Sequence, residues 1–324
     1  MNHIKHDQRL AKPGPLKEIG MEFVRVTEAA AIAASAWVGS GDKLAADEAA
    51  TNAMEARLES IESFAAQVAI GEGMKDESHG LFKGDTVGGA FDMAGEPRRF
   101  DLAVDPIDGT TPTVNGGPEA MSVLAVACEG CMYDTEEYYM LKMVVGPEVV
   151  DLWHNADISL ERPISDNLAR IAAILDKPVE KLTVCMLNRP RHEAWIKEIR
   201  CLGTRLKLIQ DCDVSGAIAA CMEEHGIDVL YGVGGAPEAV LAAAAVKSLG
   251  GAMFAQVWRD GQVSGPILNE EGLVRGPCVF SATGITDGSL LKGVRWTSRG
   301  PRTNSLFCRS ESGTVRFVDT RHGN

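Results

Sequence analysis

The sequence contains no long apolar run. No segment approaches the ~18 consecutive apolar residues that a membrane-spanning helix needs. The N-terminal stretch MNHIKHDQRLAKPG is polar and lacks the apolar core of a signal peptide. We therefore expect a cytoplasmic protein without a membrane partner.

Positive charge is also scarce. Lys and Arg number 32 against 45 Asp and Glu, the formal net charge is −13 at pH 7, and no Lys/Arg-rich run occurs. A nucleic-acid partner is disfavoured, because such surfaces need clustered cations that neutralise phosphates. A small anionic substrate would need a local group of basic side chains.

The eight cysteines have no spacing typical of a disulfide framework. They are scattered through apolar segments, so we expect most of them to be reduced and buried. Cys128 and Cys131 form CEGC, a spacing shared by redox motifs and half zinc sites. Because no second pair accompanies it, we interpret both residues as plain structural cysteines.

The chain is long enough, at 324 residues and 45% hydrophobic, to bury a large core. Apolar residues at three- and four-residue steps predict an amphipathic helix over 16–38, followed by a second helix over 43–61. Strand-like runs then occur at 66–71, 100–105, 121–128 and 139–146. These segments predict a largely antiparallel sheet covered by the two helices.

Helices and strands alternate after residue 147. Strands are expected at 182–187, 205–209 and 227–234, with helices at 165–175, 190–201, 214–224 and 236–249. The tail from residue 277 is again strand-like. We predict an α/β protein with an N-terminal α+β domain, residues 1–155, and a C-terminal α/β domain, residues 156–324.

The stretch DPIDGTT at 105–111 follows the apolar run FDLAV. A strand that ends at Val104 would place Asp105, Asp108 and the carbonyl of Ile107 around one point, a set of oxygens that hard cations such as Mg²⁺ prefer. Thr110 and Thr111 would open a short helix beside it. The alternative is an ordinary acidic turn.

Further acids follow other predicted strands. Glu72 comes after the strand at 66–71, and Glu238 lies in the glycine-rich strand-to-helix turn GVGGAPEAV. Two metal ions about 3.5 to 4 Å apart need oxygens from different elements, which these positions would supply. Glu72 is otherwise a solvated loop acid and Glu238 a favourable first-turn residue. Asp47 lies on an Ala-rich helical face and is a weak candidate from the residues alone.

Polar residues of another kind follow two strands of the second part. Arg189 and Arg191 in NRPRH have the chemistry to grip a phosphate, or they form a solvated pair. Asp211 and Asp213 in QDCDV either accept hydrogen bonds from sugar hydroxyls or cap a helix. All four follow the carboxyl ends of strands, where α/β sheets bind ligands.

Taken together, these motifs resemble a known family. The sequence is similar, in family order from about residue 17 to 290, to the class II (bacterial-type) fructose-1,6-bisphosphatases of the metal-dependent, lithium-sensitive phosphatase superfamily. The resemblance is carried by EFVRVTEAAAIAA, GSGDKLAAD, IGEG, VDPIDGTT, YYMLKMVVGP, RPRH, IDVLYGVGGAPEAV and FSATGIT.

The resemblance implies a layered sugar-phosphatase fold and a role for each matching residue. It assigns the divalent metal, Mg²⁺ or Mn²⁺, to Glu72, Asp105, Asp108 and Glu238. It assigns the attacking water to Asp47 and the scissile phosphate to Thr110. It assigns the sugar bisphosphate to Tyr139, Arg189, Arg191, Asp211 and Asp213, with Lys142 as a weaker member.

Four positions depart from the family pattern. Met74 and Lys75 stand where the family often has the final Glu of IGEGE followed by an uncharged or acidic residue, Cys212 replaces the glycine of DGD, and Glu48 replaces the glycine of ADG. They put metal preference and sugar specificity in question.

The resemblance implies hydrolysis of the 1-phosphate of fructose-1,6-bisphosphate. Sedoheptulose-1,7-bisphosphate, an inositol phosphate, and a catalytically idle sugar-phosphate sensor are the alternatives. We also expect a symmetric dimer or tetramer.

Overall fold

The computed structural model describes residues 16–62, 64–71, 80–88, 99–153 and 156–323. The α-helices are α1 (Leu16–Ser35), α2 (Lys43–Glu59), α3 (Thr110–Asn115), α4 (Pro147–Trp153), α5 (Ile164–Ile174), α6 (Glu193–Cys201), α7 (Asp213–Ala220), α8 (Ala236–Leu249) and α9 (Glu270–Leu273). Short 3₁₀ turns lie at Val179–Lys181, Pro190–His192 and Glu223–His225. None of the described helices combines the length and the apolar character needed to cross a bilayer.

The strands form two sheets. They are β1 (Ala65–Ile70), β2 (Thr86–Val87), β3 (Arg99–Asp108), β4 (Met121–Cys128), β5 (Tyr139–Val145), β6 (Thr183–Leu187), β7 (Arg205–Ile209), β8 (Val229–Gly235), β9 (Ala252–Arg259), β10 (Gln262–Asn269), β11 (Cys278–Gly284), β12 (Arg295–Thr297), β13 (Gly300–Arg309) and β14 (Thr314–Arg321). The first sheet has the order β12-β13-β11-β4-β3-β1-β2 with β14 on β13, and the second has the order β10-β9-β5-β8-β6-β7.

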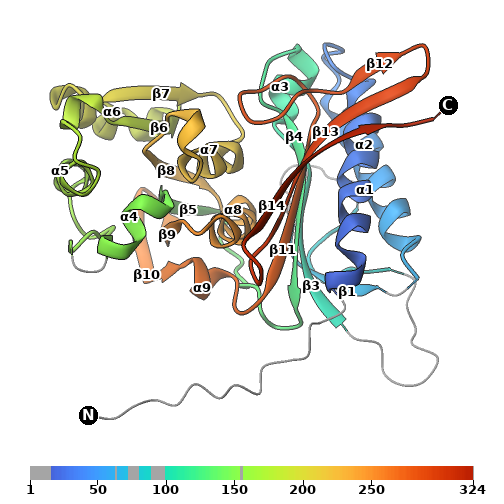
Figure 1. The fold of residues 1–324 in the computed structure, drawn as a ribbon, viewed down its shortest axis with the longest axis horizontal. Helices are drawn as coiled ribbons and strands as arrows, with labels where there is room; N and C mark the ends of the chain where they lie inside the picture. Colours follow the sequence, from blue (N-terminus) through green and yellow to red (C-terminus); the bar gives the residue numbers. More distant parts are fainter. Residues whose placement is uncertain (1–15, 63, 72–79, 89–98, 154–155, 324) are drawn as a thin grey trace, which may run out of the picture.

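The first sheet is antiparallel except for the parallel pair β1 and β3, as the sequence predicts. Helices α1 and α2 cover one of its faces, and their apolar residues form one core with that face (Figure 1). In the second sheet, β6 pairs in parallel with both β7 and β8, which confirms the predicted βαβ pattern. An α/β fold of mixed sheets is therefore confirmed.

Sheet membership does not follow the order of the chain. The sequence predicts β5 in the first sheet, and this prediction is wrong, because β5 pairs with β8 and β9 of the second sheet. The tail strands β11 to β14 return to the first sheet through the pairing of β11 with β4. Both sheets therefore draw strands from residues 1–155 and from residues 156–324.

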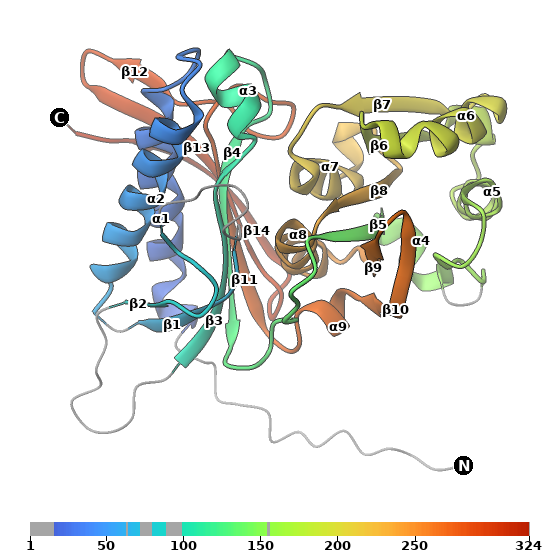
Figure 2. The ribbon, with the colours of Figure 1, turned by 180° about the vertical axis from the view of Figure 1, so that it is seen from behind.

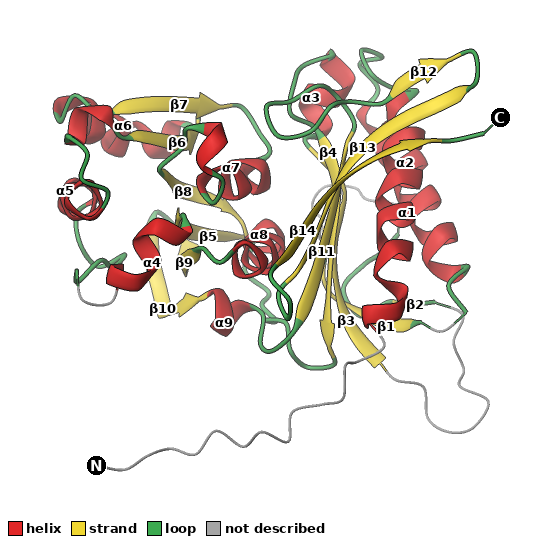
Figure 3. Ribbon diagram, in the orientation of Figure 1, coloured by secondary structure: helices red, strands yellow, loops and turns green. Residues whose placement is uncertain are grey.

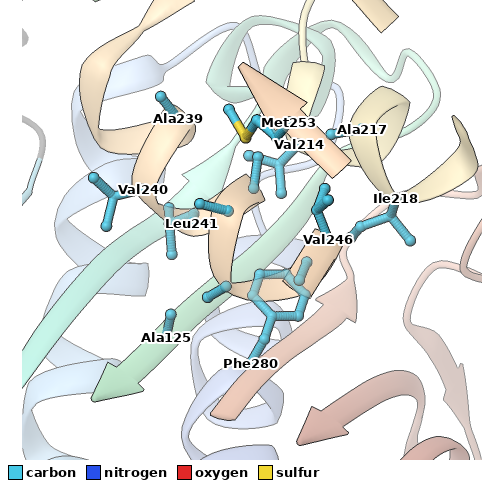
Figure 4. Packing of buried hydrophobic residues seen from close by; sticks show 14 of the residues in the cluster. Ala125, Val214, Ala217, Ile218, Ala239, Val240, Leu241, Val246, Met253 and Phe280 are labelled. Carbon is cyan, nitrogen blue, oxygen red and sulfur yellow. The ribbon is translucent and has the colours of Figure 1, made fainter. Parts of the chain in front are cut away.

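Helix α8 lies between the two sheets, as Figures 1 and 2 show from opposite sides. The arrangement has five layers, which run from α1 and α2 through the first sheet, α7 and α8, and the second sheet to α4, α5 and α6 (Figure 3). The central helix packs on both sheets, with Phe280 of β11 on one side and Met253 of β9 on the other (Figure 4). Small residues such as Ala125 and Ala244 let the helix approach closely.

The expectation for the CEGC cysteines is wrong. Cys128 and Cys131 form a disulfide with Cα atoms 5.4 Å apart. The cause is a tight turn in which Cys131 N donates to Cys128 O and Gly130 takes φ +68°, which glycine adopts without strain. The other six cysteines are free, and all of them except Cys201 are buried.

Candidate active site

The DPIDGTT stretch lies at the rim of the first sheet, where β3 ends. Asp105 and Asp108 are buried, and the pairing of β3 with β4 is irregular between them. The amide of Ile107 donates to Asp105 Oδ1 at 3.0 Å, which closes the turn. Gly109 follows at φ +102°, and a Cβ there would lie 2.4 Å from the sulfur of Cys212. The predicted short helix begins directly after it as α3.

Asp47 of α2 faces the same turn. It lines a cavity of about 270 Å³ together with Asp105, Asp108, Thr110, Asp211 and Glu238. These residues come from α2, β3, α3, the β7–α7 loop and the first turn of α8. The structure thus brings together the described members of the metal, water and phosphate groups that the sequence analysis proposed. Glu72, the remaining metal candidate, lies outside the described residues.

A second cavity of about 320 Å³ adjoins the first. Its lining includes Tyr139, Arg189, Arg191 and Asp213, which are four of the residues expected to contact the sugar bisphosphate. Asp108, Asp211 and Glu238 line both cavities. Because the two cavities share these acids, they form one elongated site. It begins at the DPIDGTT turn and extends to Arg189 and Arg191.

Arg191 is held in place by backbone and aromatic contacts. Its Nη2 donates to the carbonyl of Val233 at 2.8 Å, and its guanidinium carbon lies 5.0 Å from the centre of the Tyr139 ring. Burial lowers the pKa of Arg191 from its ordinary value, yet an arginine stays charged at neutral pH. Arg189 pairs with Asp211 at 3.6 Å. The site therefore presents two oriented cations in a protein of strongly negative net charge.

Burial and neighbouring negative charges destabilise the charged forms of two acids in the site. Burial raises the pKa of Asp108, and the neighbouring charges of Asp213, Asp211 and Glu238 raise it further. Burial likewise raises the pKa of Glu238. Within the described part of the chain, Asp108 Oδ2 and Glu238 Oε2 are buried without a hydrogen-bond partner. A hard divalent cation would satisfy both oxygens, so the donor chemistry fits such an ion.

The described residues do not complete a metal site by themselves. In the ranges that the structure describes, no three Asp, Glu, His or Cys side chains enclose a metal position. The family resemblance implies a further ligand, Glu72, which lies outside those ranges. Asp105 and Asp47 supply additional carboxylates in the same cavity.

Lys142 occupies a different position from the other predicted substrate contacts. Its side chain is 1% exposed and pairs with Asp213 Oδ2 at 2.5 Å. It does not belong to the lining of the cavity that Tyr139, Arg191 and Asp213 form. Lys142 therefore lies behind this surface.

Comparison with known proteins identifies the family. A family model described as bacterial fructose-1,6-bisphosphatase, glpX-encoded, matches residues 17–322. The chain belongs to this family. It is 39% identical over 333 residues to a protein named fructose-1,6-bisphosphatase 1 class 2 of Escherichia coli strain K12, covering 94% of this chain and 95% of that protein. Proteins named fructose-1,6-bisphosphatase class 2 from Escherichia coli O6:H1 and Shigella flexneri match to the same extent.

Membership in the bacterial fructose-1,6-bisphosphatase family confirms the prediction of a phosphatase and implies a divalent metal requirement. The relatives named above are all named as fructose-1,6-bisphosphatases, which are enzymes. The alternative of a catalytically idle sugar-phosphate sensor is therefore not favoured.

Two residues of the site were not identified from the sequence. Lys43 lines the acidic cavity and its Nζ donates to Thr111 Oγ1 at 2.8 Å, although it was considered only as a helix start. Tyr138 lines the second cavity beside Tyr139. A cation at the first position of α2, one turn before Asp47, is a signal that could have indicated Lys43.

Proposed function

We propose that this protein hydrolyses the 1-phosphate of fructose-1,6-bisphosphate, yielding fructose-6-phosphate and phosphate, a reaction of gluconeogenesis. One observation carries the proposal: an acidic cavity lined by Asp47, Asp105 and Asp108 adjoins a cavity lined by Arg189 and Arg191. The acidic cavity suits metal-assisted attack on one phosphate, and the arginines suit the second phosphate. The names of the relatives support the same substrate.

Glu72, Asp105, Asp108 and Glu238 would hold the metal, for which we propose Mg²⁺ or Mn²⁺. Enzymes accelerate phosphate monoester hydrolysis by up to ~10²¹, whereas general acid/base catalysis contributes only ~10² to 10⁴. When bound, the divalent cation would neutralise phosphate charge and lower the pKa of the attacking water.

The protein's own side chains then fix the geometry of attack. Asp47 orients the water and draws its proton, and Thr110 donates a hydrogen bond to the scissile phosphate. At the far end, Arg189 and Arg191 bind the distal phosphate, and Tyr139 supports Arg191 through its ring. Asp211 and Asp213 accept hydrogen bonds from sugar hydroxyls.

Phosphate release from three substrates tests the proposed function. Purified protein reloaded with Mg²⁺ or Mn²⁺ is given fructose-1,6-bisphosphate, sedoheptulose-1,7-bisphosphate or inositol-1-phosphate, with EDTA as the control. We expect metal-dependent release of one phosphate from fructose-1,6-bisphosphate, with fructose-6-phosphate as the product. A preference for the seven-carbon sugar would support the alternative substrate, and no turnover despite tight metal binding would support a sensor.

The role of Asp47 is tested by Asp47→Ala. We expect kcat to fall by ~10² to 10⁴, because the water loses its orienting carboxylate. Binding of Mn²⁺, followed by calorimetry, should remain. An unchanged rate would remove Asp47 from the mechanism, and a parallel loss of Mn²⁺ binding would make it a metal ligand instead.

Three broader features complete the proposal. We propose a cytoplasmic location: six of the eight cysteines are free, which is usual in reducing compartments, and the Cys128–Cys131 disulfide is the exception. We also propose a symmetric homo-oligomer, dimer or tetramer, since most soluble oligomers are homo-oligomers with closed symmetry. We also propose that the chain belongs to the lithium-sensitive phosphatase superfamily, which would predict inhibition by Li⁺.

A further inference from the structure

Lys142 is a buried cation in the middle of the second sheet. On β5 it pairs with Gly232 of β8 and Ala255 of β9, so only small side chains lie directly opposite it on either neighbour. Met140 and Val144, two positions away along the strand, belong to the core that includes α8. The alternation of a strand therefore directs Lys142 toward the space between the sheets, where the site lies.

The ammonium group of Lys142 joins two parts of the site. It pairs with Asp213 Oδ2 at 2.5 Å and donates to the carbonyl of Gly235 at 3.3 Å. Asp213 is 6% exposed and Lys142 is 1% exposed, so water screens this pair very little. Gly235 belongs to the strand-to-helix turn that carries Glu238.

The carboxylate of Asp213 has little freedom to move. A Cβ built at Gly234 would lie 1.8 Å from Asp213 Oδ2 and 2.7 Å from Lys142 Nζ, so both groups pack directly on the glycine backbone. Asp213 is also the first residue of α7 and lines the second cavity. Lys142 thus fixes one carboxylate oxygen of Asp213 on the buried side of the residue. The opposite side of Asp213 faces the cavity.

We propose that Lys142 is a positioning residue that sets the orientation of the Asp213 carboxylate for recognition of sugar hydroxyls. This inference depends on the proposed sugar-phosphate substrate. Lys142 does not contact the substrate itself: it holds one oxygen of Asp213 against Gly234 and prevents the carboxylate from rotating out of this orientation. A fixed acceptor recognises a hydroxyl more selectively than a mobile one, because its orientation does not have to be restricted on binding.

The experiment compares Lys142→Met, Asp213→Asn and the double variant with the wild type, each loaded with Mn²⁺. We measure kcat and KM for fructose-1,6-bisphosphate and the Ki of orthophosphate as a competitive inhibitor. Lys142→Met should raise KM about 10- to 100-fold, the range found for supporting residues, while kcat changes less than about 3-fold. The Ki of orthophosphate should stay the same, because orthophosphate has no sugar hydroxyls.

The double variant tests whether Lys142 acts through Asp213. If it does, the KM of the double variant will not exceed that of the single variant with the higher KM. If the two residues act independently, the two increases in KM will multiply. Lys142→Gln keeps an N–H donor for Asp213 and should raise KM less than Lys142→Met. It also serves as the test if the methionine variant does not fold.

Lys177→Met is the matched control. Lys177 pairs with Asp228 at 2.7 Å at the far end of the second sheet, so its loss should leave KM unchanged. Multiplicative effects in the double variant, or equal increases in KM and in the Ki of orthophosphate, would overturn the proposal. A wild type that does not turn over the sugar bisphosphate would refute the proposed function instead, and calorimetric binding of fructose-6-phosphate would then replace KM in the same comparison.

Discussion

Cys212 has a backbone conformation that glycine usually adopts. Its φ is +65° and its ψ is 52°, in the left-handed region, and it stands where the family pattern DGD has glycine. The thiol is buried and donates to the carbonyl of Asp108 at 3.2 Å, and burial raises its pKa, so it remains protonated. A left-handed residue costs about 1–2 kcal/mol unless it is glycine. The thiol also links two parts of the site, a contact that glycine could not make.

Cys212→Ala and Cys212→Gly separate the two effects. Both variants lose the sulfur contact with Asp108, but only the glycine relieves the left-handed backbone. We expect Cys212→Gly to be more stable than Cys212→Ala by about 1 kcal/mol in urea unfolding with EDTA present. Equal stabilities would show that the backbone at this position carries no strain.

His192 joins the arginine turn to β8. Its Nε2 accepts from the amide of Val233 at 2.9 Å, so the ring proton lies on Nδ1, which donates to the carbonyl of Leu187 at 2.7 Å. Burial lowers the pKa of His192, and the charges of Arg191 and Arg189 lower it further, while the Leu187 carbonyl and Asp213 oppose this shift. The folded protein therefore requires neutral His192.

This requirement predicts a loss of stability in acid. Below the unfolded pKa of about 6.5, the unfolded chain binds the proton more readily than the folded one, so the free energy of unfolding falls as pH falls. His192 should contribute at most about 1.4 kcal/mol per pH unit between pH 6.5 and its folded pKa. Urea unfolding at pH 7.5 and 5.5 should show a steeper loss for the wild type than for His192→Gln. Parallel losses would contradict this origin.

At the scale of elements, the turn after β4 is closed by the disulfide of Cys128 and Cys131. The carbonyl of Cys131 accepts a hydrogen bond from the amide of Arg275, so the turn also contacts the segment before β11. The linker between the two sheets begins at this turn. A closed loop this short restricts the unfolded chain only modestly, by about 2 kcal/mol in the chain-entropy treatment.

Thiol titration tests the disulfide directly. Protein denatured without reductant should expose six reactive thiols, and prior reduction should raise the number to eight, because six cysteines are free and two are paired. Cys128→Ser is the control: it should leave one additional thiol, that of Cys131. Eight thiols before reduction would mean that the pair is open.

At the scale of the whole molecule, α8 connects the two sheets and carries Glu238 in its first turn. Ala243, Ala244 and Ala245 are fully buried, since the helix contacts a sheet on each side. The methyl side chains at these positions are small and set the distance between the layers. The separation of the sheets, and with it the alignment of the acidic and basic cavities, depends on this helix.

Ala244→Leu should disturb this spacing. Three added heavy atoms in a close-packed layer cost about 1–3 kcal/mol of stability, which guanidinium unfolding measures. Ala173→Leu, on the exposed surface of α5, should change stability by less than about 0.5 kcal/mol. A tolerated leucine at position 244 would show that the layers can separate without cost.

The sequence alone determined the positions of most helices and strands, the chemistry of the site and the family. The apolar periods located α1, α2 and α8 and most strands to within a few residues, because these patterns follow from local backbone geometry. The motif around DPIDGTT indicated the chemistry and the family, since metal and phosphate sites restrict residue types at fixed spacing.

Only the tertiary structure decided how these parts meet. It assigned β5 to the second sheet and the tail to the first, because strand pairing joins residues that are distant in the chain and leaves no local pattern. It also placed Lys142 behind Asp213 and the Cys212 thiol on the Asp108 carbonyl. Partners of buried polar groups depend on which elements pack together, and that is settled by the burial of the whole core rather than by any one segment.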